Sequence, residues 1–462
     1  MHARRLLILL AMACAILPWS MVQAAKFNVL FIAVDDLNNN LGCYGHPQVK
    51  SPHIDRLAAR GVRFDRAYCQ YPLCNPSRVS LLSGRRPDTT GIMDLQTPPR
   101  THLHDVVFLP QYFRQQGYYT AHVGKIFHTG PEFEDPASWD HEIRETGKHP
   151  PEDKILRGKR VERPNKNSLD WAELKSSDAE TADGVVAAQA SEMLRERARA
   201  GTPFFLGVGF RRPHSPYAAP RKYFELYPTA SIPPLAEPAE HVRAIPASAL
   251  TIPADTPPLS DDLRREITSA YWACITFVDA QIGMVLDALD EAGLAKNTVV
   301  VLYGDHGYHL GEHGGLLHKM TLFEESARVP LVVFTPGAEG NGQACQRLVE
   351  FVDIYPTLVD LCGLPSAEGL EGKSLRPLLD NPRASWTDAA FTQVIHGGVM
   401  GRSVRTSRWR YTEWDEGRAG RELYDHDADP HEYINLAEDP KSSATVAELK
   451  QLLRSRPALS AK

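Results

Sequence analysis

Residues 26–36 read KFNVLFIAVDD, and this stretch decides the fold class. Residues 26–34 form a continuous apolar run, which is typical of a strand buried on both faces in a parallel sheet. Residues 203–210 (PFFLGVGF) and 297–303 (NTVVVLY) have the same character. Each run stops abruptly at charged or polar residues. The sequence therefore predicts buried parallel strands that present polar side chains at their carboxyl ends.

Helical patterns alternate with these apolar runs. Residues 181–199 and 269–292 carry apolar side chains at helical spacing. Alternation of strand and helix predicts an α/β fold with a large, mainly parallel sheet between helices. In such sheets, ligands bind beyond the carboxyl ends of the strands. We therefore expect the site where Asp35-Asp36, residues 211–214 and Asp305-His306 follow the three runs.

The chain divides near Asp380-Asn381-Pro382. Beyond this point, short β-like runs at 389–395 and 404–413 precede an amphipathic segment at 446–454. We therefore predict a main domain over residues 25–381 and a small C-terminal α+β domain with an antiparallel sheet over 382–462. Within the main domain, the proline-rich stretches 129–177 and 213–258 are expected to be surface excursions that shape a binding site.

The first residues read as a secretory signal peptide. A basic start (Arg4, Arg5) leads into an apolar run at 6–17, and Val22-Gln23-Ala24 offers small residues for cleavage after Ala24. Residues 1–24 are therefore predicted to be removed, and the mature protein is expected to be soluble and periplasmic or secreted. No later segment is expected to cross a bilayer.

Net charge and cysteine spacing exclude some classes of binding partner and of structural cross-link. The net charge of −6 and the lack of a basic run argue against nucleic acid. Of the seven cysteines, Cys14 lies in the signal peptide, and the irregular spacing of the others suits neither a disulfide framework nor a zinc cluster. If Cys74 is withdrawn for chemistry, an odd number of cysteines remains, so we expect at least one free thiol in the mature chain.

Two pairs of metal-ligand residues follow two of the predicted strands. Adjacent carboxylates repel each other unless a positive charge lies between them, and a hard divalent cation with oxygen ligands satisfies this need. A single pair such as Asp35-Asp36 is more simply explained as the cap of a turn or helix. A second pair, Asp305-His306, on another strand of the same sheet favours a metal site.

Residues 309–313 (HLGEH) match H-x-x-E-H, a zinc-peptidase pattern. That chemistry needs both histidines on one face of a stable helix. Glycines at 307, 311, 314 and 315 make such a helix weak. The segment is therefore predicted to be a glycine-rich loop beside the site.

Residues 74–84 (CNPSRVSLLSG) resemble the signature of type I sulfatases, C-x-P-S-R-x-x-x-L-[ST]-G. Ser83 stands where threonine is commoner. In that family, an export-coupled maturase oxidises the cysteine to Cα-formylglycine, and its hydrated form is the nucleophile. The alternative is a buried thiol at the start of a helix.

The chemistry of sulfate esters fits this resemblance. Attack on an ester surrounded by negative oxygens needs an activated nucleophile, cations that spread the charge, and an acid for the leaving alcohol. A gem-diol bound to a divalent metal supplies the nucleophile. Its second hydroxyl lets the sulfated intermediate collapse to the aldehyde and expel sulfate, an exit that Cys, Ser or Thr lacks.

The resemblance extends over residues 28–336, with a recognisable tail from residue 422 (ELYD). It is strongest to the iduronate-2-sulfatase branch, through LGCYGHPQVKSPHIDRLA (41–58), LPQYFRQQGYYTAHVGKIFHTG (109–130), RRPHSPY (211–217) and DHGYHLGEHG (305–314). It implies an alkaline-phosphatase-like fold, one Ca²⁺ per chain, and hydrolysis of a sulfate ester on a sulfated saccharide derived from a polysaccharide or glycosaminoglycan.

The resemblance also assigns residues to roles. It implies that calcium is bound by Asp35, Asp36, Asp305, His306 and modified Cys74. It implies that the remaining catalytic residues are Arg78, Lys125, His128, His214 and Lys319. Among these, Arg78 braces the formylglycine, His128 is the base for elimination, and Lys319 binds sulfate and helps to protonate the leaving oxygen. The stretch from His313 to Lys319 is one residue longer than in the iduronate enzyme.

Two rival functions remain open at this point. One is a phosphonate or phosphate monoester hydrolase of the same superfamily, since phosphonate hydrolases also carry formylglycine. The other is a non-catalytic saccharide-binding homologue, which would be expected to have lost a ligand or the cysteine. Several sugars and sulfated positions also remain open as substrates.

Overall fold

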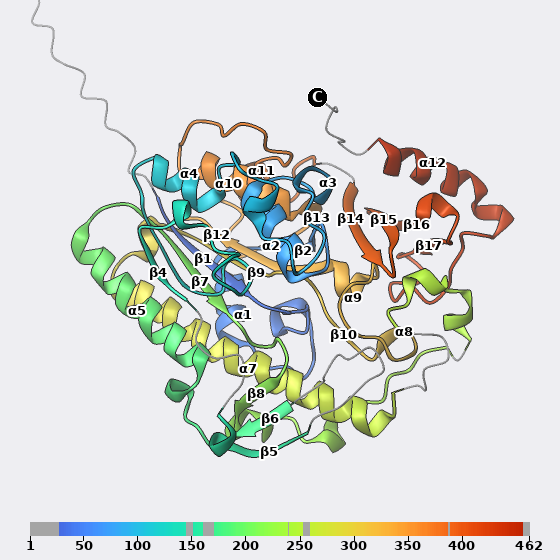
Figure 1. Cartoon of the computed structure of the whole chain (residues 1–462), viewed down its shortest axis with the longest axis horizontal. Coiled ribbons are helices and arrows are strands. Elements are labelled where there is room, and N and C mark those ends of the chain that lie inside the picture. Colours follow the sequence, from blue (N-terminus) through green and yellow to red (C-terminus); the bar gives the residue numbers. More distant parts are fainter. Residues whose placement is uncertain are drawn as a thin grey trace, which may run out of the picture.

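The protein is described here by a computed structural model that covers residues 27–144, 151–159, 171–238, 240–252, 259–386 and 389–455. The predicted signal peptide at residues 1–24 lies outside the described residues. The main body is a mixed eight-stranded sheet with helices on both faces, and a smaller sheet lies at one end (Figure 1).

The large sheet has the strand order β13–β2–β12–β9–β1–β7–β3–β4. Its strands are β1 (Asn28–Val34), β2 (Val62–Tyr68), β3 (Tyr119–Gly124), β4 (His141–Ile143), β7 (Phe204–Phe210), β9 (Thr298–Gly304), β12 (Arg328–Phe334) and β13 (Ala344–Glu350). Strand β12 runs antiparallel to both of its neighbours, and the other pairs are parallel. The three apolar runs form β1, β7 and β9, which lie side by side as predicted.

Both faces of the sheet are covered by helices. One apolar cluster includes side chains of α1 (Pro52–Arg60), α5 (Ala182–Ala200) and α7 (Asp261–Glu291). The opposite cluster includes side chains of α2 (Cys74–Ser83), α4 (Leu109–Gln115), α10 (Ile354–Leu361) and α11 (Arg376–Asp380). Along β1, Leu30 and Ile32 enter the first cluster, while Val29 and Phe31 enter the second. Because successive side chains of a strand point to opposite faces, this double burial explains the continuous apolar run.

Helix α7 begins at Asp261, earlier than the predicted start at residue 269. The Ser260 hydroxyl caps it by accepting from the Leu263 backbone N–H, and acidic residues fill the first turn. The helix is also long and apolar enough to cross a membrane by length and composition, contrary to expectation. However, 83% of its most apolar 18-residue stretch is buried inside the protein, as in a helix that forms part of a protein core.

The C-terminal part is a four-stranded antiparallel sheet with one long helix, as predicted. It consists of β14 (Ala389–His396), β15 (Val399–Thr406), β16 (Trp409–Trp414), β17 (Arg421–Asp425) and α12 (Ser443–Arg454). The single run predicted at 404–413 is in fact the end of β15 and most of β16, because the chain turns at Ser407-Arg408. These elements have an apolar cluster of their own. The exact boundary after residue 381 stays a prediction.

The long excursions contain small structured pieces. Strands β5 (Ile155–Lys159), β6 (Trp171–Leu174) and β8 (Tyr217–Pro220) form a three-stranded sheet, and β10 (His309–Leu310) pairs with β11 (Leu317–His318). The short helices are α3 (Pro87–Thr90), α6 (Arg221–Phe224), α8 (Glu312–Gly315) and α9 (Glu324–Ala327). Among the described residues, no disulfide bond joins two cysteines.

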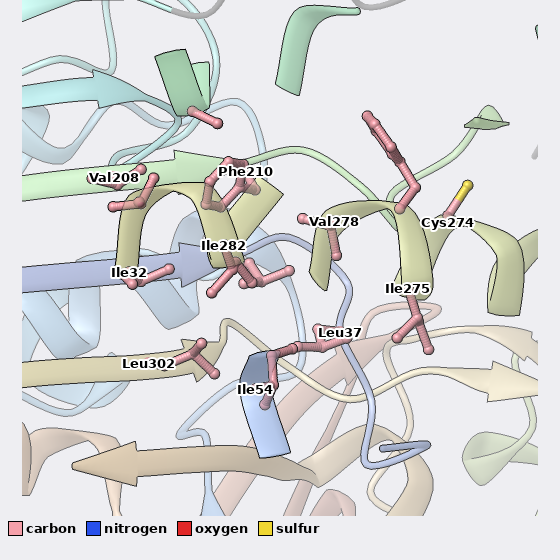
Figure 2. Packing of buried hydrophobic residues seen from close by; sticks show 14 of the residues in the cluster. Ile32, Leu37, Ile54, Val208, Phe210, Cys274, Ile275, Val278, Ile282 and Leu302 are labelled. Carbon is pink, nitrogen blue, oxygen red and sulfur yellow. The ribbon is translucent and has the colours of Figure 1, made fainter. Parts of the chain in front are cut away.

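Replacing Ile282 by alanine is expected to lower the free energy of unfolding by about 2–5 kcal/mol, because it leaves a cavity against β1. Ile282 and Ile32 belong to the same apolar cluster, drawn in Figure 2, and both side chains are fully buried. Met284, on the same helix, is 45% exposed, so Met284→Ala should change this free energy by less than about 0.5 kcal/mol. Urea denaturation measures both; equal losses would contradict the packing described.

Candidate active site

Many of the predicted site residues lie in loops that follow the carboxyl ends of four neighbouring parallel strands, β9, β1, β7 and β3. Val34 of β1 is in register with Gly304 of β9 and Phe210 of β7, and Gly209 of β7 pairs with Gly124 of β3. The strands therefore end at nearly the same level. The loops after them carry Asp35-Asp36, Asp305-His306, Lys125 to His128, and His214.

Close approach of β3 and β7 needs two glycines. Gly124 has a left-handed φ of 81°, and a Cβ there would lie 2.1 Å from the Gly209 carbonyl oxygen. A Cβ on Gly209 would lie 2.0 Å from the carbonyl oxygen of Lys125. Larger residues would therefore push apart the two strand ends, and with them the segment that carries Lys125.

Cys74 lies at the centre of the polar cluster. It is the first residue of α2, and its side chain is fully buried. Its Sγ atom is 3.4 Å from His306 Nε2, 3.2 Å from Lys319 Nζ and 3.9 Å from Asp36 Oδ1. The thiol therefore lies at the start of a helix, as the buried-thiol alternative predicts, but its neighbours are a carboxylate, an imidazole and an ammonium group from other segments of the chain.

Two overlapping groups of side chains have ligand atoms within 4.8 Å of one another. One group is Asp35, Asp36, Cys74 and His214; the other is Asp35, Cys74, Asp305 and His306. Asp36 takes a left-handed φ of 60°, and its backbone N–H donates to Asp305 Oδ1 at 3.0 Å. Such strained residues are concentrated at functional sites. The two predicted pairs of ligands therefore meet.

The donor set fits a divalent cation. The Nδ1 atom of His306 is 2.9 Å from the Gly307 carbonyl oxygen, which can only accept, so the proton is assigned to Nδ1. Its Nε2 lone pair then faces Asp36 Oδ1 at 3.3 Å and Asp305 Oδ1 at 3.6 Å. Three buried carboxylates repel one another, and together with one oriented imidazole they form a ligand set suited to a hard cation.

Arg78 connects these ligands to the sheet. Its fully buried guanidinium donates from Nε to Asp305 Oδ2 at 2.8 Å and from Nη2 to Asp35 Oδ1 at 3.3 Å. Its Nη1 donates to the carbonyl oxygens of Lys125 and Ile126 at 2.6 and 2.9 Å. One planar side chain therefore fixes three of the strand-end segments.

Two lysines compensate the carboxylates. Lys125 Nζ donates to Asp35 Oδ2 at 2.6 Å, and Lys319 Nζ donates to Asp36 Oδ1. Burial alone would raise the pKa of Asp35 and of Asp36, but cations led by Lys125 and by Lys319 respectively hold both pKa values below the usual range. Lys319, from the stretch of unusual length, thus reaches the cluster. His318 and Met320 on either side of it have left-handed φ values of 75° and 72°.

The two predicted histidines differ in position. His214 lies within ligand distance of Asp35, Asp36 and Cys74, and its Nδ1 is 2.6 Å from the Ser215 carbonyl oxygen. His128 belongs to neither ligand group; its ring packs edge-on against Phe133 at 4.9 Å. Burial lowers the pKa of both histidines to about 3, so both are neutral at neutral pH and each keeps one unprotonated ring nitrogen.

Three supporting residues were not anticipated from the sequence. The Ser77 hydroxyl donates to the Asp305 carbonyl oxygen, and Tyr271 on α7 donates to the Asp36 carbonyl oxygen at 2.6 Å. Asp183 accepts from the backbone N–H groups of Arg211 and Arg212 at 2.8 and 3.0 Å, which holds the segment leading to His214. Ser77 stands inside the signature motif, but nothing in the sequence pairs Asp183 or Tyr271 with these loops.

The H-x-x-E-H segment is not a zinc-binding helix. Helix α8 has only four residues, and His313 and Gly314 within it have non-helical backbone angles. The Nε2 atom of His309 lies 2.7 Å from Thr321 Oγ1, whereas His313 Nε2 lies 3.4 Å from Glu325 Oε2. The glycine-rich loop expected from the sequence is confirmed.

Comparison with known proteins agrees with this geometry. The family described as Sulfatase matches residues 27–364, and the one described as N-sulphoglucosamine sulphohydrolase, C-terminal, matches residues 311–458. The chain belongs to the sulfatase family. A sulfatase of Formosa agariphila is 34% identical, covering 93% of this chain and 87% of its own. Mouse iduronate 2-sulfatase is 32% identical, covering 92% and 93%.

Solved structures give the same fold. A phosphonate monoester hydrolase of Agrobacterium radiobacter superposes with a TM-score of 0.79 at 25% identity, covering 93% of this chain and 95% of its own. A 2-O GAG sulfatase superposes with a TM-score of 0.73 at 26% identity, covering 93% and 91%. This sulfatase is therefore a sulfuric ester hydrolase with an alkaline-phosphatase-like fold.

Replacing Arg78 by lysine is expected to reduce turnover about 100-fold, because an ammonium cannot hold three strand-end segments in one geometry. Unfolding should also be easier by about 1–3 kcal/mol, since buried acceptors lose their donors. Arg56→Lys, at an exposed ion pair with Asp287, is the matched control. Kinetic assay and thermal melting measure both effects; wild-type turnover in Arg78→Lys would contradict this role.

Proposed function

We propose that this sulfatase removes a sulfate ester from an acidic saccharide of the glycosaminoglycan type, with a formylglycine made from Cys74 as nucleophile. The observation that carries this proposal is the position of Cys74. Its Sγ atom lies within reach of Asp36, His306 and Lys319, at the carboxyl ends of the parallel strands. A reacting group there has a carboxylate, an imidazole and an ammonium group within reach.

The unmodified thiol is poorly suited to attack. Burial, and then the charge of Asp35, raise the pKa of Cys74 to about 12, so the thiol stays protonated at neutral pH. A hydrated formylglycine at this position would supply two hydroxyls on one carbon. One would attack sulfur; the other would then lose its proton and become the aldehyde oxygen, which breaks the bond between the carbon and the sulfated oxygen and expels sulfate. The sequence motif around Cys74 is the one that a formylglycine-generating maturase reads during export.

Calcium is the ion proposed for the carboxylate cluster. Asp35, Asp36, Asp305 and His306 would hold it together with modified Cys74. When bound, a divalent cation there lowers the pKa of a nearby hydroxyl and offsets negative charge on sulfate oxygens. The protein's own contribution is to fix these ligands, since Arg78 binds Asp35 and Asp305 at once.

The remaining side chains have complementary roles in this proposal. Lys125 and Lys319 bind and neutralise the sulfate oxygens. Burial alone would lower the pKa of Lys319, but the charge of Asp36 raises it. Lys319 is thus a charged donor for the leaving oxygen. His214, in the loop after β7, binds sulfate as well. His128, neutral at neutral pH, takes the proton released when sulfate is eliminated.

The substrate proposal rests on the relatives. Iduronate 2-sulfatases of mouse and man are each 32% identical over nearly the full chain, and a 2-O GAG sulfatase shares the fold at 26% identity. A 2-sulfated uronate is therefore the first substrate to try. We further propose that residues 1–24 direct export to the periplasm or medium and are removed there, without membrane attachment afterwards.

A phosphonate monoester hydrolase is the second candidate function. It is favoured by the similarity to the Agrobacterium radiobacter enzyme, with its TM-score of 0.79. Phosphorus and sulfur esters present similar tetrahedral oxyanions to the same cations. The two functions differ in which ester is cleaved faster by the same preparation.

Inorganic sulfate release should be measured first, with protein coexpressed with a maturase and conversion of Cys74 checked by mass. A 2-sulfated uronate disaccharide is expected to release sulfate, and its 4- and 6-sulfated hexosamine counterparts are not. Cleavage of a phosphonate monoester, measured by release of its alcohol, is expected to be slower. Cys74→Ala should be inactive, because it lacks the nucleophile, while Cys43→Ala should remain active. Faster cleavage of the phosphonate would favour the second candidate; no release by converted protein would refute the proposal.

Asp305→Ala is expected to abolish turnover while the protein stays folded, because the remaining carboxylates lack a partner ligand and the nucleophile is misplaced. Asp35→Ala should behave alike. Calcium at 100 times its Kd should stabilise the wild type by about 2.7 kcal/mol and neither variant. Asp287→Ala, an exposed carboxylate, is the control. Thermal melting with calcium and with chelator decides; equal stabilisation of Asp305→Ala would refute the metal assignment.

A further inference from the structure

A second cluster of metal-ligand side chains lies at the edge of the large sheet, apart from the catalytic ligands. It consists of His122 on β3, Glu142 on β4 and Glu134 in the connection between them. His122 and Glu142 are directly paired in the parallel register of β3 and β4, so their side chains point to the same face. Figure 1 places β4 at the outer edge of the sheet.

The imidazole of His122 is oriented toward the two carboxylates. Its side chain is fully buried, and its Nδ1 atom lies 3.0 Å from the Gly124 carbonyl oxygen, which fixes the proton on Nδ1. The ring also packs against that of Trp139, with centroids 4.7 Å apart. The lone pair on Nε2 is therefore held toward Glu134 and Glu142.

The distances do not match hydrogen bonds. His122 Nε2 is 3.7 Å from Glu134 Oε2 and 3.8 Å from Glu142 Oε2. Within the part of the chain that the structure describes, both His122 Nε2 and Glu134 Oε2 are buried without a hydrogen-bond partner. Two ligands about 2.1 Å from a tetrahedral ion lie about 3.4 Å apart, close to the spacing seen here.

We propose that His122, Glu134 and Glu142 form a binding site for a first-row divalent cation of the zinc type. One imidazole nitrogen and two carboxylate oxygens are a ligand set that zinc accepts, with a fourth position left for water. Calcium, which prefers oxygen ligands alone, suits it less. The supporting contacts are also those of metal sites: a carbonyl accepts from His122 Nδ1, and Arg144 binds Glu142 Oε1 at 2.6 Å.

Such an ion would hold the segment after β3, which carries Lys125 and His128, without being part of the catalytic cluster. His122 precedes Lys125 on the same strand end, and Glu134 follows Phe133, whose ring packs against His128. An ion shared by β3, β4 and this connection would fix the position of the segment that carries both Lys125 and His128. It is a structural site with a positioning effect, and it leaves the catalytic calcium ligands untouched.

The test measures Zn²⁺ and Co²⁺ binding to the full-length mature protein in excess Ca²⁺, which occupies the hard-ligand cluster. We expect one saturable Zn²⁺ site, and visible absorption of four-coordinate Co²⁺. Glu134→Gln and Glu142→Gln should weaken Zn²⁺ binding at least about tenfold, since each removes one anionic ligand. Glu132→Gln, an exposed glutamate in the same connection, should bind as the wild type does.

Two further variants separate this site from others. Asp305→Ala should keep the Zn²⁺ site, because its ligands lie elsewhere, and His141→Ala should keep it too, because His141 is an exposed neighbour of Glu142. Thermal melting confirms that each variant is folded. The proposal is overturned if the wild type binds no Zn²⁺ beside Ca²⁺, if both glutamine variants bind as tightly as the wild type, or if Asp305→Ala or His141→Ala loses the site.

Discussion

The mutual repulsion of three buried carboxylates is the constraint on which the rest of the structure depends. Asp35, Asp36 and Asp305 are all within 1% of complete burial, and Asp36 N–H already bonds to Asp305. Ionised groups in such a place are costly unless they are paired. Arg78 and Lys125 bring compensating charge from two other elements. The folded chain therefore carries a balanced site that a divalent cation can enter.

This balance requires the strand ends to be aligned. Were β1 and β9 out of register by one residue, Asp35 and Asp305 would face opposite sides of the sheet, because side chains alternate along a strand. The continuous burial of β1, β7 and β9 enforces the alignment, since slipping would also expose apolar groups. Packing on both faces of the sheet thus fixes the positions of the charged side chains at the carboxyl ends of the strands.

Much of this could be predicted from the sequence, for a physical reason. Apolar runs and the residues directly after them are local patterns, so the strand ends with their ligands and the motif at Cys74 could be identified. Contacts between distant segments leave no such pattern. Asp183 holds the backbone before His214, and His122 meets Glu134 only because β3 and β4 pair. The start of α7 at Asp261 was not predicted, because the first turns of this helix are polar, as loops usually are.

The elements of the C-terminal antiparallel sheet contact the loop that carries Lys319, even though a domain boundary is predicted near residue 381. Lys319 reaches Asp36 from a loop that continues into α9, and the first N–H of α9, on Glu324, donates to Glu432 at 2.8 Å. Arg410 of β16, 1% exposed, pairs with both Glu324 and Glu432. Removing the C-terminal elements would take Arg410 and Glu432 away from the start of α9 and release the loop that carries Lys319. The two family matches overlap over residues 311–364, a range that includes both Lys319 and Glu324.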